Sequence, residues 1–265
     1  MHPNISINTL CLPEAPFATH LEQVVRLGAR AIGPGLEEIT ATGVDASARA
    51  LRDAGLTVST LTHRAFSFAT TEDAGAGRDR LNATIDVAAT IGARTITMTT
   101  GGRGALSWRD AAARFAEAIA PCAERARTAG VALSLEPTSH LYADASIAHR
   151  LADTVALARA AGIGVGIDLF ACWTDADIED AIAAAGPIAA LVQVSDHVAG
   201  DRALPCRAVP GDGMIPLDRL VPLIVHAGFY GFWDIEVIGP RLAADGYGKG
   251  LARAADRLGT WIDAA

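Results

Sequence analysis

The feature that most restricts the fold of this chain is a repeated alternation of two kinds of segment. Short apolar, β-branched runs are each followed by a Gly, Pro, Ser or Thr break and then by a stretch rich in Ala, Arg, Glu and Leu. These patterns are typical of strands and helices respectively. Several helical stretches stop at a glycine, such as Gly92 or Gly162, a common helix-ending signal. We expect strands at residues 5–10, 29–34, 56–63, 95–100, 131–137, 163–170, 188–196 and 232–238.

Most of these runs are apolar almost throughout, as in parallel strands covered by helices on both faces. Eight strand–helix alternations without a linker favour a closed (β/α)₈ TIM barrel over an open doubly wound sheet. Spacing alone leaves the open sheet as an alternative, although no glycine fingerprint of a dinucleotide site follows the first strand. The 265 residues are close to the ~250 of a one-domain barrel, so we expect one domain over residues 1–265.

Composition narrows the class of partner. The net charge is −8 and Lys249 is the only lysine, with no basic run, which argues against a nucleic-acid partner. No window reaches the ~20 apolar residues of a membrane span, and the N-terminus lacks a signal-peptide pattern. The four cysteines are scattered, which indicates free thiols in a reducing compartment. We therefore expect a soluble, cytoplasmic protein with a small-molecule substrate; self-association into a homo-oligomer stays open.

Polar residues interrupt the last four expected strands near their carboxyl ends, where the active sites of such barrels lie. Strand five ends in SLEP, strand six contains GIDLF, strand seven reads LVQVSD, and strand eight reads WDIEVIGP. A single acid there is commonly a helix cap or an arginine partner. Carboxylates from neighbouring strands repel one another unless a cation lies between them. We therefore predict a metal site made of Glu136, Asp168, Gln193 and Glu236.

With these segments in view, the chain resembles the xylose isomerase-like TIM barrel superfamily, the sugar phosphate isomerase/epimerase group. The resemblance covers essentially the whole chain and is strongest in SLEPTSH, GIDLFACW, LVQVSDH, RAVPGDGMIPL and WDIEVIGP. It implies one divalent metal held by residues of strands five to eight. It also implies that the two glutamates, here Glu136 and Glu236, are catalytic and move a proton beside a substrate carbonyl.

Two positions depart from the family pattern. Gln193 stands where the family usually has a metal-binding His, and Ala171 stands where many members have a substrate-contacting His. An amide oxygen makes the ligand set all-oxygen, which favours Mn²⁺ or Mg²⁺ and leaves Co²⁺ and Zn²⁺ as alternatives.

Five further residues are predicted to bind substrate. The resemblance places an arginine ahead of a Pro-Gly-x-Gly loop in the substrate site, and here that residue is Arg207. The others close strands or follow them at the same end of the barrel: His63, Trp173, Asp196 and His197.

The predicted activity is isomerisation or epimerisation of a sugar, keto-sugar or polyol derivative through an enediolate. Loss of a β-hydroxyl from the same intermediate would make the protein a metal-dependent dehydratase or lyase. A sugar-binding barrel without catalysis is the third alternative. An apurinic-site endonuclease of the same superfamily fits poorly, because that group uses several zinc ions with many histidines and this acidic chain has neither those histidines nor a basic surface.

Overall fold

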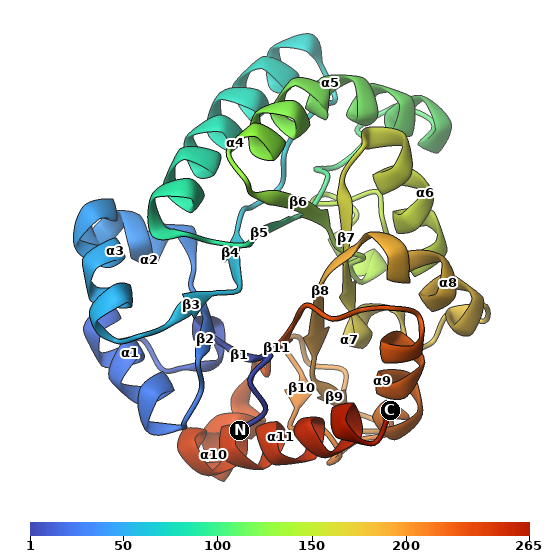
Figure 1. The fold of residues 1–265 in the computed structure, drawn as a ribbon. Helices are drawn as coiled ribbons and strands as arrows, with labels where there is room; N and C mark the ends of the chain where they lie inside the picture. The colour runs from blue at the N-terminus through green and yellow to red at the C-terminus, as the bar shows by residue number, and fades with distance from the viewer.

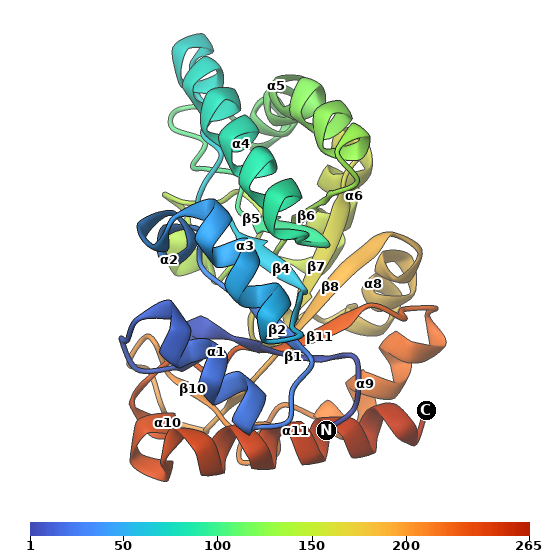
Figure 2. The same cartoon turned by 60° about the vertical axis from the view of Figure 1, so that its left-hand side comes forward.

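The predicted alternation of strands and helices runs along the whole chain. A computed structural model describes residues 1–265, with the strands in an inner ring and the helices around it (Figure 1; Figure 2). The strands of the ring are β1 (Ile5–Asn8), β2 (Ala31–Gly33), β3 (Thr57–Val58), β4 (Thr60–Thr62), β5 (Thr95–Met98), β6 (Ala132–Leu135), β7 (Gly164–Asp168), β8 (Ala189–Val194) and β11 (Phe232–Ile235).

All paired strands of the ring are parallel, in the order β3-β2-β1-β11-β8-β7-β6-β5-β4. Because β3 and β4 meet at Ser59 in the chain, the two ends of this order join, which confirms the predicted TIM barrel and excludes the open sheet. The predicted strand 56–63 is present but broken at Ser59. Its hydroxyl lies 2.6 Å from that of Ser6 and 3.1 Å from the carbonyl oxygen of Ile32, so the side chain turns into the barrel.

The outer layer begins and ends its helices with the signals seen in the sequence. Thr70 caps α4 through a reciprocal bond with Asp73, and α4 and α6 end at the left-handed glycines Gly92 and Gly162, with φ of 71° and 67°. No helix is both long and apolar enough to cross a membrane. The α-helices are α1 (Phe17–Arg26), α2 (Leu36–Thr42), α3 (Val44–Asp53), α4 (Thr71–Ile91), α5 (Trp108–Thr128), α6 (Leu151–Ala161), α7 (Leu169–Cys172), α8 (Ile178–Ala185), α9 (Leu217–His226), α10 (Pro240–Asp245) and α11 (Tyr247–Asp263).

The hydrophobic core lies between the ring and the helices. Alternate strand residues face outward, and those such as Ile7, Ile32 and Leu61 are fully buried with helix residues such as Leu81 and Ile85. Burial of a large aliphatic side chain contributes about 1.5–3 kcal/mol to folding, so this layer dominates the stability of the barrel.

The inside of the barrel is polar and lined by small side chains, whereas bulky branched residues fill most TIM barrels. The hydroxyls of Thr60 and Thr97 lie 2.7 Å apart, and Asn8 donates a 2.8 Å hydrogen bond to the carboxylate of Asp234. A methyl group added at Gly33 would lie 2.9 Å from Asp234, so glycine is needed there.

Candidate active site and metal centre

The four predicted metal ligands come from four strands that are adjacent in the ring, β6, β7, β8 and β11. Asp168 and Gln193 are register partners, while Glu136 and Glu236 directly follow the last residues of β6 and β11. The backbone N–H groups of both glutamates continue the sheet, bonding to Met98 and Val194. Glu136, Asp168 and Glu236 line one cavity of about 220 Å³, whereas Gln193 is buried and is not part of its lining.

Asp168 is oriented by its own helix. It is the N-cap of α7, and its Oδ1 accepts a 3.0 Å hydrogen bond from the backbone N–H of Phe170. An N-cap bond of this kind fixes the side-chain rotamer. The carboxylate is 4% exposed, so its remaining lone pairs face the other polar groups of the site and not bulk water.

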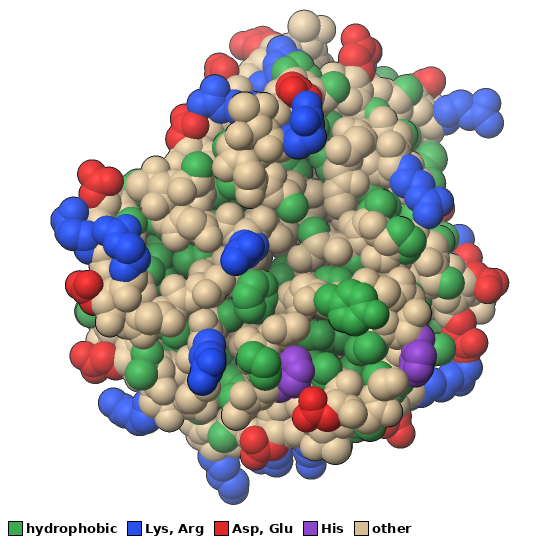
Figure 3. Space-filling model, in the orientation of Figure 1, with side chains coloured by type: hydrophobic (Ala, Val, Ile, Leu, Met, Phe, Trp, Pro, Cys, Tyr) green, Lys and Arg blue, Asp and Glu red, His purple; other side chains and the backbone are tan.

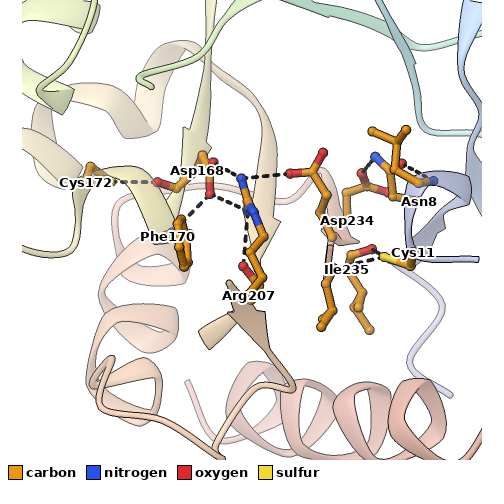
Figure 4. A network of polar contacts seen from close by, with 12 residues as sticks. Asn8, Cys11, Asp168, Phe170, Cys172, Arg207, Asp234 and Ile235 are labelled. Carbon is orange, nitrogen blue, oxygen red and sulfur yellow. Dashed lines mark hydrogen bonds and ion pairs between the residues drawn. The ribbon is translucent and has the colours of Figure 1, made fainter. Parts of the chain in front are cut away.

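Arg207 supplies the positive charge of the site. Its guanidinium forks onto Asp168, with Nη1–Oδ1 of 3.1 Å and Nη2–Oδ2 of 2.7 Å (Figure 4). Its Nη2 also lies 3.1 Å from Oε2 of Glu236. The Arg207 side chain is 15% exposed. Burial alone would lower the pKa of this guanidinium, but the two carboxylates beside it raise that pKa above its usual value.

The two glutamates are electrostatically crowded. Burial raises the pKa of Glu136 well above its usual range, and the charges of Glu236 and Asp168 raise it further. Burial also raises the pKa of Glu236, to about 7, although Arg207 opposes the shift. Carboxyl groups with a pKa raised toward neutrality are suited to take up and release protons at physiological pH.

Gln193 faces the same group and is incompletely bonded. Its side-chain amide is a hydrogen-bonding neighbour that lowers the pKa of both glutamates. Its Oε1 atom is buried without any hydrogen-bond partner. A buried amide oxygen left unpaired costs about 1–3 kcal/mol, which suggests that a ligand satisfies it.

The donor chemistry of these four side chains fits a hard divalent cation. All four offer oxygen, one of those oxygens is an unpaired buried carbonyl, and three are carboxylates that repel one another. As the side chains stand, no three His, Cys, Asp or Glu residues are grouped so as to hold a metal ion. Arg207 binds two of the predicted ligands, Asp168 and Glu236, and thus competes for the oxygens that a metal would use.

Asp196 has a different environment from the one predicted for a substrate-binding residue. Its two carboxylate oxygens accept four backbone N–H bonds of 2.7–3.0 Å, from His197, Gly211, Gly213 and Ile215. A carboxylate has about four lone-pair sites, so all of them are filled. This acid holds the PGDG loop in place, and we do not assign it to the substrate site.

His197 and Trp173 lie in a neighbouring cavity of about 630 Å³, which shares Phe170 and Cys206 with the first cavity. The rings of His197 and Trp173 are 6.5 Å apart, and the rings of His197 and Phe170 are 5.9 Å apart in an edge-to-face arrangement. The two residues thus border the group around Arg207 without touching its carboxylates, and only a substrate that extends from one cavity into the other would reach them.

The structure does not bring His63 to this group. Its Nδ1 lies 2.8 Å from the hydroxyl of Thr84 on α4, and it lines a separate cavity of about 340 Å³ with Arg80 and Glu37. Strand alternation explains this position, because His63 is one residue past the inward-facing end of β4 and therefore points outward toward the helices.

Sequence reasoning missed two residues that position Arg207. Phe170 lies against the guanidinium, with its ring centre 4.7 Å from Cζ (Figure 4). The hydroxyl of Ser195 accepts a 3.1 Å hydrogen bond from Nη1. The signal available for Phe170 was its place two residues after an acid that caps a helix. Nothing in the sequence pattern distinguished Ser195 from other strand-end serines.

The comparisons with known proteins identify the family and the fold. The sequence matches the family model described as "Xylose isomerase-like TIM barrel" over residues 21–258, whereas no curated protein matches it. Protein SMc04130 from Sinorhizobium meliloti 1021 is 27% identical, with a TM-score of 0.83 and 98% of each chain covered.

Two less similar structures share the fold. The IOLI protein, whose structure has a bound zinc atom, is 14% identical with a TM-score of 0.84 and 98% of each chain covered. D-Psicose 3-epimerase with D-tagatose, from Clostridium cellulolyticum H10, is 14% identical with a TM-score of 0.83, over 98% of this chain and 99% of the other. Since the family model spans most of the residues, the chain belongs to the xylose isomerase-like TIM barrel family.

Proposed function

We propose that this protein is a metal-dependent isomerase or epimerase that moves a proton beside the carbonyl of a sugar, keto-sugar or polyol derivative. The observation that supports it most is the pair Glu136 and Glu236, two glutamates at the ends of different barrel strands that border one cavity. In the ring, β7 and β8 lie between their strands, so the two glutamates border the cavity from non-adjacent strands.

Proton transfer by this pair balances simply. The carboxylate of one glutamate takes the proton from the carbon next to the carbonyl, and the electron pair of the broken C–H bond forms an enediolate. The protonated glutamate on the other side returns a proton to the opposite face of the same carbon, or to the next carbon. The first outcome is epimerisation and the second is isomerisation.

Glu136, Asp168, Gln193 and Glu236 would hold the ion, and a bound divalent metal would supply Lewis-acid polarisation of the carbonyl. Their all-oxygen chemistry favours Mn²⁺ or Mg²⁺. The relatives support such a site, since one has a bound zinc atom and another is a 3-epimerase of a keto-sugar.

Two features support a small hydroxylated substrate. The cavity of about 220 Å³ is lined both by charged groups and by apolar side chains such as Phe170 and Ile238. The face of the molecule in Figure 3 intersperses basic and acidic side chains around its rim and has no continuous basic patch, as a polyanionic substrate would require.

Solvent deuterium exchange tests the proposal directly. The purified protein is incubated with Mn²⁺ in D₂O and a panel of ketoses, polyol ketones and oxidised sugars, with the Glu136→Gln variant as the matched control. We expect deuterium to enter at the carbon beside the carbonyl of at least one compound, and only with the parent protein.

The outcome also separates the alternatives. Loss of water from a substrate, giving an unsaturated or keto product, would identify a dehydratase or lyase that uses the same carboxylates. Saturable binding of a sugar that no added Mn²⁺, Mg²⁺, Co²⁺ or Zn²⁺ turns into exchange or product would contradict the proposal and identify a binding protein.

A further inference from the structure

The site already contains a cation of its own. One guanidinium, that of Arg207, binds both oxygens of Asp168 and one oxygen of Glu236, at 2.7–3.1 Å. Oδ1 of Asp168 also accepts the backbone N–H of Phe170, so its two lone-pair sites are filled. Two of the four proposed metal ligands are thus engaged by hydrogen-bond donors.

This placement of Arg207 is built into the fold. Phe170 stacks against the guanidinium at 4.7 Å, the hydroxyl of Ser195 accepts from Nη1, and the backbone N–H of Arg207 bonds to the carbonyl of Ile238. The residue lies on β10 (Arg207–Ala208), which pairs antiparallel with β9 (Asp196–His197). Ring stacking, strand pairing and the two parallel hydrogen bonds to Asp168 together orient the guanidinium toward the carboxylates.

A guanidinium and a divalent ion cannot use the same carboxylate lone pairs. A metal ligand must present a free lone pair, and each N–H of Arg207 covers one. Two positive charges within a few ångströms also repel each other strongly in a site screened from water. Occupation by metal and occupation by Arg207 are therefore alternatives.

We infer that Arg207 is an internal counter-cation that competes with the metal: a divalent ion binds as Arg207 leaves Asp168 and Glu236. The inference rests on the metal site of the proposed function. Without metal, Arg207 keeps the buried acids from repelling one another. With metal, the released guanidinium turns its donors toward the cavity that it lines, so metal loading and presentation of Arg207 to the cavity are one event.

Mn²⁺ titration of the Arg207→Met variant tests the competition. Methionine keeps an unbranched apolar stem and removes the charge and all the donors. We expect Mn²⁺ affinity by calorimetry to rise at least about tenfold, as a charge within ~4–6 Å changes the proton affinity of a carboxylate by about 10- to 1000-fold. Without metal the variant should unfold at a lower temperature than the parent, and Mn²⁺ should raise its unfolding temperature more than that of the parent.

Two further variants serve as controls for the Arg207→Met experiment. Arg241→Met removes the same charge from an arginine paired with Asp201 and should leave Mn²⁺ affinity within about twofold. Arg207→Lys keeps the charge without the fork and should give an intermediate affinity, and it serves if the methionine variant does not fold.

An Arg207→Met variant that binds Mn²⁺ no more tightly than the parent overturns the competition. If the parent protein still catalyses deuterium exchange in the presence of Mn²⁺, the proposed function survives and only this inference fails. If neither protein binds Mn²⁺, Mg²⁺, Co²⁺ or Zn²⁺, the competition and the metal dependence fail together.

Discussion

Asp168 and Asp196 are both buried acids near the ends of adjacent strands, yet they are held in opposite ways. Asp196 accepts four backbone N–H groups, and a methyl group added at Gly213 would lie 2.3 Å from its Oδ1. Asp168 accepts one backbone N–H group and otherwise depends on the side chain of Arg207. The carboxylate of Asp196 is thus held by backbone donors, whereas that of Asp168 is held mainly by a side chain that can move.

Under the proposed function, this difference separates the structural acid Asp196 from the acids of the candidate site. Backbone donors cannot leave without unfolding the loop, so Asp196 cannot exchange its partners for a ligand. A guanidinium can rotate away, and the acids around Asp168 repel one another while it does so. Gln193 strengthens the contrast because its buried carbonyl oxygen has no partner at all. Buried acids with exchangeable partners beside an unpaired amide oxygen are therefore the features on which the proposed site rests.

The largest effect should follow from removing the proton carriers. Glu136→Gln and Glu236→Gln should each slow deuterium exchange by about 10²–10⁴-fold, the usual contribution of a positioned acid or base. Each change keeps the size of the side chain and an oxygen that can reach a metal. Exchange is followed by NMR, and thermal unfolding checks the fold.

Glu124→Gln is the matched control, because Glu124 lies on the surface in an ion pair with Arg127 and should not affect exchange. Exchange by either active-site variant within about threefold of the parent would reject the two-glutamate mechanism.

The next effect tests the two aspartates against each other. Asp196→Asn should lower the free energy of unfolding by about 2–4 kcal/mol, because the amide has only one acceptor oxygen and leaves about two backbone N–H groups unpaired. Asp168→Asn should lower the free energy of unfolding by less than Asp196→Asn does, since it also removes one of three carboxylate charges that repel one another. Urea unfolding measures both.

Mn²⁺ binding should show the reverse order. We expect Asp168→Asn to lose it and a folded Asp196→Asn to keep it. Equal losses of Mn²⁺ affinity in the two variants would mean that the loop anchored by Asp196 belongs to the metal site after all.

The fold was largely predictable because the barrel depends on patterns that repeat. The eight strands were found from their apolar runs, and the helix ends at Gly92 and Gly162 from their glycines. The break at Ser59 was not predictable, because it depends on hydroxyl contacts with Ser6, a residue 53 positions away. The polar interior likewise depends on which face of each strand turns inward.

The candidate site was predictable only in part. Parallel strands place their carboxyl ends together, so grouping Glu136, Asp168, Gln193 and Glu236 needed only their strand positions. What engages each side chain depends on loop geometry, which no periodicity encodes. Asp196 accepts hydrogen bonds from the PGDG loop, and His63 contacts Thr84 in the outer layer of helices. The fork of Arg207 onto Asp168 follows from a strand pair, β9–β10, that the sequence did not indicate.

A smaller effect, on the pH dependence of stability, is expected at His63. Like Asp168, His63 is a buried polar residue that is hydrogen-bonded by a side chain. Burial, helped by the charge of Arg80 on α4 and opposed by Glu37 on α2, lowers the pKa of His63 to about 4. Between pH 6.5 and 4 the unfolded chain therefore binds a proton that the folded chain does not. Stability should fall as pH falls through this range, by about 3 kcal/mol, since each pKa unit corresponds to 1.36 kcal/mol.

His63→Gln should remove that share of the pH dependence. Urea unfolding of the parent and the variant at pH 7 and pH 4.5 gives the comparison, with His226→Gln as the control because His226 is bonded at the surface of α9. A pH dependence as steep in His63→Gln as in the parent would show that His63 is not the group that titrates.

The smallest effect concerns which metal the site prefers. Gln193 is 3% exposed, its Oε1 lacks a partner, and both glutamates lie beside it. Gln193→His should be tolerated and should shift the ratio of Zn²⁺ to Mn²⁺ affinity toward Zn²⁺ by about tenfold, because an imidazole nitrogen is a softer ligand than an amide oxygen. Competitive titration of parent and variant with the two ions measures the ratio, which cancels any general change in stability. Since Arg207 competes with both ions alike, Arg207→Met should raise both affinities and leave the ratio unchanged. An unchanged ratio in Gln193→His would place Gln193 outside the ligand set. A buried water would then satisfy its unpaired oxygen, and Gln193, like Asp196, would have a structural role.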